Sequence, residues 1–288
     1  MAGTKAAVLK KQKVLKKLPI WSTIKEAFGL YTKHFKLFIL ISATLYALPA
    51  ILNFIPSKDN PGLALIKLPF VIVGVIISLW GAIALITAIA TIYANKQTGY
   101  KQSFGLAWPK IWPYFVNSML LALILIPAYA LIIIPGVYFS IIYAFVTIAV
   151  ILEDHKKVSP FKMSAALVKN YFWNVFLYFL AVALTYLPII ILCIIFVAAV
   201  SLKAFAVNPV YSLVLQVVEA VAVPYLLAAN FMLYSKLKKL KRTAPELKDK
   251  KALAPHVNGC LVSAGLIILY ILIGVAIFFI FRLHFPHS

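Results

Sequence analysis

Acidic residues and cysteines are scarce in this sequence of 288 residues. It has 7 aspartates and glutamates and 2 cysteines, against 28 lysines and arginines. Zinc sites and disulfide frameworks need closely spaced cysteines, whereas Cys193 and Cys260 lie far apart in apolar runs. Metal-assisted hydrolysis needs grouped carboxylates and histidines, and here both kinds of residue are scattered. We therefore expect a protein that is not an enzyme and that has no metal site and no cofactor.

Charged residues of either sign are few, which excludes an ordinary soluble domain. They make up 12% of the chain, whereas apolar residues make up 64%. Soluble domains are about 25% charged and about 45–50% apolar. The sequence therefore predicts an integral membrane protein. We expect it to be all-α, because a helix satisfies its own backbone hydrogen bonds in lipid.

Seven apolar stretches are long enough to cross a bilayer, which needs about 20 helical residues. They are residues 37–55, 68–94, 114–134, 136–152, 172–200, 210–234 and 257–281. Only Pro135 and Gly136 separate the third stretch from the fourth, which predicts a tight hairpin or a kinked helix followed by a short one. The expected fold is a polytopic transmembrane bundle of about seven spans.

The basic residues are sorted along the chain by the predicted spans. Of the 28 lysines and arginines, 24 fall in segments on one side of the membrane, and only Lys58, Lys67, Lys203 and Arg282 fall on the other. Because cytoplasmic loops are enriched in lysine and arginine, the pattern predicts a cytoplasmic N-terminus and an outer C-terminus in the cell membrane. The expected partner is the bilayer, with anionic headgroups at its inner face, and not nucleic acid.

The charge and hydropathy pattern divides the chain into four parts. Residues 1–20 form a basic cytoplasmic tail, which is either amphipathic and membrane-bound or simply solvated. A six-span membrane domain follows at 21–242, a basic linker at 243–256, and a seventh span with a short outer tail at 257–288.

Three segments that precede the first, third and fifth spans resemble one another. Residues 24–30, 100–106 and 161–167 share the pattern apolar-Lys-x-small-apolar-small-Leu, broadly kept in each copy. Each continues with apolar residues at helical spacing, namely Ile24, Phe28, Tyr31 and Phe35; Tyr100, Phe104, Ala107 and Ile111; and Phe161, Ala165, Val168 and Phe172. The pattern predicts three repeats, each an interfacial amphipathic helix followed by a two-span hairpin; the alternative is chance similarity.

Two of these helices carry N-terminal signals. Thr23 and Glu26 have the spacing of a capping box, and Ser159 before Pro160 is typical of an N-cap followed by proline at the first helical position.

Residues 135–139, 151–154 and 159–173 together resemble the membrane domain of the glycerophosphoryl diester phosphodiesterase family and related six-span bacterial proteins. The shared features are a span with Pro-Gly-Val-Tyr, a short acidic turn and an interfacial helix with an aromatic re-entry, and residues 224–234 resemble the closing span. The resemblance covers residues 21–242 and implies a fold and a membrane location. The seventh span departs from the family, and no phosphodiesterase domain follows.

Glu219 is the acidic residue deepest within any predicted span. Gln216 lies one turn before it, and Asn230 returns to nearly the same helical face eleven residues later. Ionisable residues within a membrane are costly and often functional, so these three residues form a candidate intramembrane polar site. Two interpretations are open: a polar stripe along a substrate or proton path, or a protonated glutamate hydrogen-bonded between helices.

Small residues recur every four positions at Gly74, Ser78 and Ala82 and at Gly259 and Ser263. This spacing lets helix backbones approach closely, either within the chain or across a dimer. For function, the sequence predicts a structural, scaffold or membrane-organising protein. The alternative is a transporter of a small solute or lipid that uses the polar stripe around Glu219.

Overall fold

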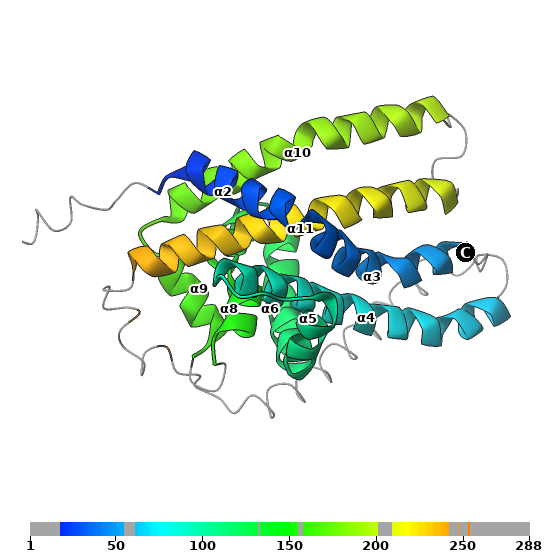
Figure 1. Cartoon of the computed structure of the whole chain (residues 1–288), viewed down its shortest axis with the longest axis horizontal. Helices are drawn as coiled ribbons and strands as arrows, with labels where there is room; N and C mark the ends of the chain where they lie inside the picture. The colour runs from blue at the N-terminus through cyan, green and yellow to red at the C-terminus, as the bar shows by residue number, and fades with distance from the viewer. Residues whose placement is uncertain are drawn as a thin grey trace, which may run out of the picture.

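The fold is known from a computed structural model that describes residues 18–54, 61–131, 133–154, 158–200, 209–241, 247 and 253 (Figure 1). Within these residues every regular element is helical, which confirms the expected all-α bundle. The basic tail up to residue 17, nearly all of the linker and the seventh predicted span at 257–281 lie outside the described residues.

Eleven elements follow one another along the chain. They are α2 (Ile20–Lys33), α3 (Phe35–Asn53), α4 (Pro61–Tyr93), α5 (Tyr100–Ala107), the 3₁₀ turn η1 (Trp108–Lys110), α6 (Ile111–Leu131), α7 (Ile133–Ile142), α8 (Val146–Leu152), α9 (Pro160–Val168), α10 (Phe172–Val200) and α11 (Pro209–Leu240).

Five described segments are long and apolar enough to cross a membrane. They are Phe35–Asn53, Leu65–Tyr93, Tyr100–Ala130, Ile133–Leu152 and Ser212–Leu240. A sixth is obtained if α9 and the first part of α10, Pro160–Val168 and Phe172–Thr185, count as one broken span bent by 95°. The chain is therefore a multi-pass membrane protein, and the described segments overlap the first six predicted spans.

Each short helix that precedes a predicted hairpin packs on the helix that closes another hairpin. α5 packs on α4, α9 packs on α8, and α2 packs on α11. The helices that open the hairpins follow the same order, since α6 contacts α4, α10 contacts α7, and α3 contacts α11. The same order of contacts thus recurs for the three units, and the repeat itself stays a prediction.

Hydrogen bonds join each short helix to its neighbour. The Tyr31 hydroxyl of α2 donates to the Val221 carbonyl of α11 over 2.9 Å, and the Trp80 indole of α4 donates to the Phe104 carbonyl of α5 over 2.8 Å. The Ser164 hydroxyl of α9 donates to the Ile142 carbonyl and accepts the Phe145 amide. These two bonds of Ser164 satisfy backbone groups at the break between α7 and α8.

The same two repeat positions are buried in all three short helices. Ala27, Ser103 and Ser164 occupy one position, and each is fully buried. Four residues later, Tyr31, Ala107 and Val168 are also buried. Phe28 and Phe35 of the predicted stripe are exposed on the protein surface, and the buried side of α9 includes Met163 and Leu167. Small residues at the buried position allow close backbone approach, and an apolar stripe that meets the membrane stays a prediction.

The three short helices differ in their direction. α9 ends at a sharp bend, where Asn170 has a positive φ of 69°. α5, by contrast, continues through η1 into α6 as the long segment Tyr100–Ala130. α2 runs beside α11 (Figure 1), with contacts from Lys236 to Val221. The three predicted helices are present, but only α9 turns sharply from the helix that follows it.

One predicted helix start is correct and one is wrong. Ser159 is the N-cap of α9 and Pro160 its first residue, as expected. The capping box at Thr23 and Glu26 does not form, since α2 already begins at Ile20. The Thr23 hydroxyl instead donates to the Pro19 carbonyl, and Glu26 pairs with Lys236 of α11. The helix thus begins about one turn earlier than the capping box predicts.

The hairpin predicted at Pro135 and Gly136 forms between α6 and α7, but both residues lie within the first turn of α7. Proline is tolerated there because the first turn has no intrahelical partner for its missing N–H. Gly136 is needed for close packing, because a Cβ there would lie 2.3 Å from the Tyr129 ring. The Tyr129 hydroxyl is hydrogen-bonded to Ser140 over 2.9 Å and fixes the ring in place.

The small residues of α4 pack within the chain. Ser78 donates to the Leu45 carbonyl of α3 over 2.8 Å, and Gly74 faces Leu48. Gly81 continues this surface, since a Cβ there would lie 2.5 Å from Leu45. The intramolecular interpretation is therefore confirmed for Gly74 and Ser78, whereas Gly259 and Ser263 lie outside the described residues.

The buried core lies toward one end of the bundle. We call this the basic end; it is formed by the start of α2 and by the ends of α4, α8, α9 and α11. Residues 83–89 of α4 are all buried, whereas Leu65, Ile72 and Ile76 near its start are exposed. The same gradient occurs in α10, where Val175 is buried and Leu187 is 50% exposed.

Candidate functional site

Asn230, the last residue of the predicted polar site, lies on α11 where this helix crosses the break between α7 and α8. Its amide nitrogen donates to the Ala144 carbonyl over 3.3 Å, and its side-chain oxygen is buried without a partner among the described residues. Ser164 satisfies the neighbouring backbone groups of the same break. Asn230 therefore has a structural task, because it pairs a carbonyl that the helix break leaves free.

Gln216 and Glu219 lie closer to the start of α11, away from the basic end. The Gln216 side-chain oxygen is buried without a described partner. Glu219 is exposed on the surface of the bundle, and its carboxylate is close enough to act electrostatically on the Tyr46 phenol of α3. Among the described contacts, no hydrogen bond joins Glu219 to Gln216 of the same helix or to a neighbouring helix.

None of the three predicted residues lines either of the two cavities described below. Asn230 pairs with a helix break, Gln216 is partly buried, and Glu219 faces outward. Among the described residues, neighbouring helices thus cover α11 near Asn230 and leave it open at Glu219.

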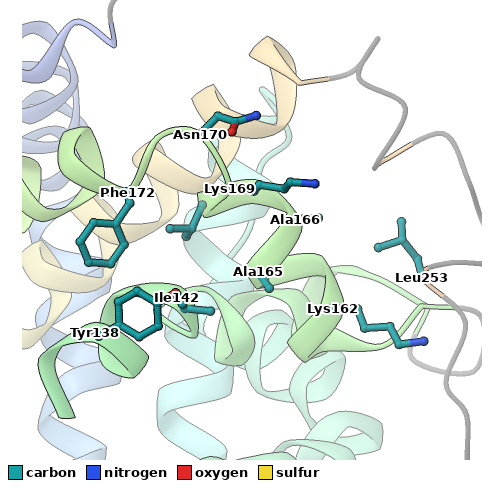
Figure 2. Close-up of a pocket in the computed structure, with 10 residues that line it drawn as sticks. Tyr138, Ile142, Lys162, Ala165, Ala166, Lys169, Asn170, Phe172 and Leu253 are labelled. Carbon is teal, nitrogen blue, oxygen red and sulfur yellow. The ribbon is translucent and has the colours of Figure 1, made fainter. Parts of the chain in front are cut away.

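One cavity lies beneath α9 at its bend into α10 and has a volume of about 520 Å³ (Figure 2). Tyr138 and Phe172 lie at one side with ring centroids 5.3 Å apart, and Lys162 and Lys169 lie toward Leu253 at the other. The Leu253 carbonyl accepts the Ser159 amide over 2.7 Å. The cavity is thus bordered by residues that also hold the start of α9.

A second cavity, which we call the lateral groove, has a volume of about 690 Å³ and lies between α2, α10 and α11. Its lining is mainly apolar and comprises Trp21, Ile24, Lys25, Phe28 and Tyr31 of α2, Thr185 of α10, and Val217, Val218, Val221, Ala222 and Tyr225 of α11. Burial raises the pKa of the Tyr31 phenol. None of the three predicted site residues lines this groove.

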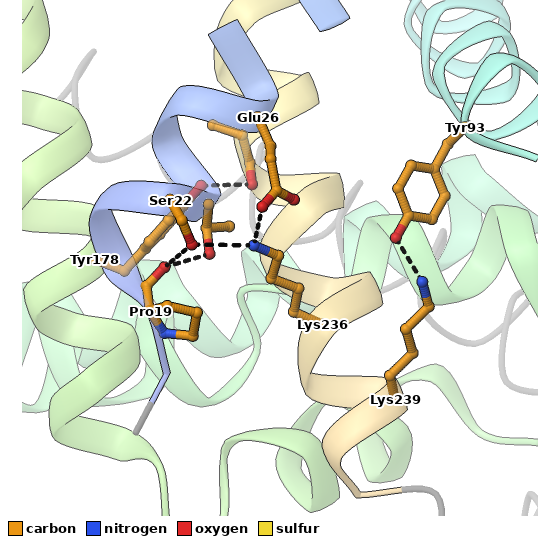
Figure 3. Close-up of polar contacts among 9 residues, drawn as sticks. Pro19, Ser22, Glu26, Tyr93, Tyr178, Lys236 and Lys239 are labelled. Atoms are coloured by element: carbon orange, nitrogen blue, oxygen red, sulfur yellow. Dashed lines mark hydrogen bonds and ion pairs between the residues drawn. The ribbon is translucent and has the colours of Figure 1, made fainter. Parts of the chain in front are cut away.

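The last turns of α11 carry lysines that each reach a different element (Figure 3). Lys236 pairs with Glu26 of α2 over 2.8 Å, and Lys239 donates to the Tyr93 hydroxyl of α4 over 2.8 Å. Lys238 pairs with Glu153 after α8, and Lys241 donates to two carbonyls at the end of α9, those of Ala166 and Lys169. Four lysines of one helix thus contact the ends of four others.

Burial and charge differ among these lysines. Lys241 is 6% exposed, and it donates to carbonyls at the negative end of the α9 dipole. Glu153 receives both Lys238 and the Tyr234 hydroxyl, so its carboxylate is neutralised and hydrogen-bonded at the same time. Lys239 also lies 4.9 Å from the centre of the Tyr93 ring, within range of a cation–π interaction.

The sequence interpretation counted these lysines only as charges on the inner side. At about 100° per residue, positions 236, 238, 239 and 241 fall on widely separated faces of a helix. This spacing fits a helix end surrounded by water as well as one surrounded by neighbouring helices, so the sequence carried no signal for these contacts.

Within the described part of the chain, no group of three or more histidine, cysteine, aspartate or glutamate side chains could hold a metal ion. Comparisons of the chain with protein-family models, with curated proteins and with solved structures found no match. The resemblance to the phosphodiesterase membrane domain therefore stays a prediction.

Proposed function

We propose that this integral membrane protein is a non-enzymatic, membrane-organising scaffold of the cell membrane. The observation that carries the proposal is the set of contacts that the four α11 lysines make with α2, α4, α8 and α9. Polar side chains of a transporter commonly face a water-filled path or a substrate. Here they are used to join helices to one another, as expected of a rigid support.

The basic end is proposed to lie at the cytoplasmic face. The segments assigned to the inner side from their charge hold 24 of the 28 basic residues. Contacts of α11 with the start of α2 and the end of α8 bring such segments together. The C-terminus would then lie outside if residues 257–281 form the predicted seventh span. Anionic headgroups of the inner leaflet would supply the counter-charge.

Single cysteines labelled by a membrane-impermeant reagent test this orientation, in a background without Cys193 and Cys260. Cysteines at Lys58, Lys203 and His287 are expected to react in intact cells, whereas one at Gln97 is expected to react only after permeabilisation. Labelling of Gln97 from outside would overturn the proposed orientation. Labelling of His287 only after permeabilisation would remove the seventh span.

A second candidate function, transport of a small solute or lipid, is favoured by the exposure of Glu219. This carboxylate lies within the apolar segment Ser212–Leu240, where an ionisable side chain facing lipid is unfavourable. Proximity to Tyr46 of α3 gives it one polar neighbour. A transported cation or proton would give the position a purpose that a scaffold does not.

Purified protein in sealed liposomes separates these two functions. If the protein is a scaffold, an encapsulated dye should leak and a fluorescent lipid should cross the bilayer at the rates measured in protein-free liposomes. Glu219→Gln is expected to behave identically. Flux above that background which Glu219→Gln abolishes, with an unchanged melting temperature, would favour the transporter and overturn the scaffold.

The resemblance to the membrane domain of the phosphodiesterase family is retained as part of the proposal. The six described apolar segments between residues 35 and 240 match the number of spans that it implies, when the bent pair is counted as one. The proposal assigns no phosphodiesterase activity to this chain, because the acidic and histidine residues that such chemistry needs are few in its sequence.

A further inference from the structure

The lateral groove combines an apolar wall with a cationic group at one end. Val217, Val218 and Ala222 of α11 line its apolar part, and Trp21 and Lys25 come from the first turns of α2. The start of α2 belongs to the basic end, because Lys236 of α11 contacts Ser22 and Glu26 (Figure 3). The groove therefore extends from the basic end toward the middle of the bundle.

Lys25 is available for a ligand. Its neighbour Glu26 is engaged by Lys236 over 2.8 Å, whereas Lys25 is exposed and has no hydrogen bond or ion-pair partner among the described residues. Trp21 beside it is 73% exposed. Tryptophan favours the headgroup level of a membrane, so the pair is suited to meet the polar part of a lipid.

We propose that the lateral groove binds one anionic phospholipid of the inner leaflet. An acyl chain would lie against Val218 and Ala222, and the phosphate would meet Lys25. Charge complementarity supports this occupant, since the apolar wall leads to a lysine at the basic end that has no partner among the described residues. The inference rests on the proposed cytoplasmic location of that end, which decides the leaflet.

The size of the groove suits a small ligand. Its volume of about 690 Å³ lies within the range of about 300–1,000 Å³ that is typical of small-ligand pockets. The mainly apolar lining with one lysine near its end matches a lipid chain and its anionic headgroup.

A contact between α10 and α11 closes the back of the lateral groove. Thr185 of α10 and the Tyr225 hydroxyl of α11 approach to 3.5 Å, and the Tyr225 ring packs on Phe28 and Tyr31 of α2. These side chains form a wall behind the space between α10 and α11. A lipid would enter from the side, from the bilayer, without crossing the bundle.

Retention of lipid by the full-length protein tests the proposal. The protein is incubated in mixed micelles with equal amounts of phosphatidylglycerol and phosphatidylcholine, washed, and its bound lipid counted by mass spectrometry. The wild type is expected to retain about one phosphatidylglycerol per chain. Ala222→Phe fills the groove and is expected to lose it, whereas Ala47→Phe, an exposed alanine of α3 outside the groove, is expected to keep it.

A charge variant provides the second measurement. Lys25→Gln is expected to lower the ratio of phosphatidylglycerol to phosphatidylcholine by roughly fivefold, the effect of one lysine near an anionic headgroup. Lys33→Gln, at the other end of α2, is expected to leave the ratio unchanged.

Three outcomes would overturn the lipid site: no lipid on the wild type, equal retention by the two phenylalanine variants, or equal ratios for the two glutamine variants. The last comparison still decides if Ala222→Phe does not fold. A failure of the cysteine-labelling experiment would change the leaflet, and it would leave these lipid counts interpretable by themselves.

Discussion

The two ends of the bundle are held together in different ways. At the basic end the helices bury continuous segments, such as residues 83–89 of α4, and lysines of α11 join four elements. Toward the opposite end α4 exposes successive residues, including Val71, Ile72 and Val73, over most of its surface, although Gly74 still faces Leu48 of α3. Lipid chains solvate such apolar surfaces as well as protein does. The contrast teaches that polar contacts and close packing are concentrated where water and headgroups would otherwise separate the helices.

The largest effect on stability is expected from an isoleucine-to-alanine substitution at the buried end of α4, compared with the same substitution near its exposed start. Ile86 is 1% exposed, and Ile86→Ala should lower the free energy of unfolding by about 2–4 kcal/mol, because it leaves a cavity. Ile76 is 47% exposed, and Ile76→Ala should change it by less than about 0.5 kcal/mol. Denaturant titration in detergent measures both. Equal losses would show that the two ends are packed alike.

Lys241 and Lys239 compare a buried and an exposed lysine of the basic end. Lys241→Met leaves the Ala166 and Lys169 carbonyls without this donor, and we expect a loss of about 1.5–3 kcal/mol. For Lys239→Met the loss should stay below about 1 kcal/mol, since an exposed charge is well solvated without its partner. The same denaturant titration measures both variants. If Lys241→Met did not lower the free energy of unfolding, the contacts of the basic end would not be what stabilises the fold.

The hairpin of α6 and α7 tests whether the opposite end also has specific packing. Gly136→Ala should destabilise the protein by about 1–3 kcal/mol, because the new Cβ would collide with the Tyr129 ring. Gly105→Ala is the control, since nothing lies within 4 Å of the Cβ position there. It should be neutral or slightly stabilising, because alanine favours a helix. Melting temperatures that rank these variants in the reverse order would contradict the observed hairpin.

The smallest effect on stability is expected at Glu219. Because this side chain is exposed and makes no described hydrogen bond to Gln216, Glu219→Gln should change the unfolding free energy by less than about 0.5 kcal/mol. Glu219→Leu should leave it unchanged or raise it, because an ionisable side chain that faces lipid is unfavourable. Melting temperature in detergent is sufficient to check this. If Glu219→Leu alone were destabilising by more than about 1 kcal/mol, a buried glutamate that joins helices would be the better description.

Most of the secondary structure could be predicted from the sequence. Apolar stretches of about 20 residues form helices in lipid whatever their neighbours, because backbone groups have no other partner there. The boundaries were less predictable. Pro135 and Gly136 predict a tight hairpin or a kinked helix followed by a short one, whereas both residues lie in the first turn of α7, where Gly136 packs on Tyr129.

The candidate site was harder to predict than the helices. Spacing along α11 correctly placed Glu219 and Asn230 near one helical face, but it could not indicate what would cover that face. Asn230 meets the break between α7 and α8, which depends on residues about 86 positions away. The sequence pattern indicates only topogenic charge for Lys236, Lys238, Lys239 and Lys241. Their partners are side chains and carbonyls of other helices, which the spacing along α11 does not reveal.

The amino-acid sequence by itself determined that this chain is a helical membrane protein, since its apolar content and few charges allow no other class of fold. It also determined which segments are basic, and so the predicted orientation. The tertiary structure decided which polar groups pair, where the core lies, and that a groove opens between α2, α10 and α11. Composition and periodicity determine how each segment interacts with the lipid or water around it. Hydrogen-bond pairing and cavities depend instead on which side chains distant parts of the chain bring together.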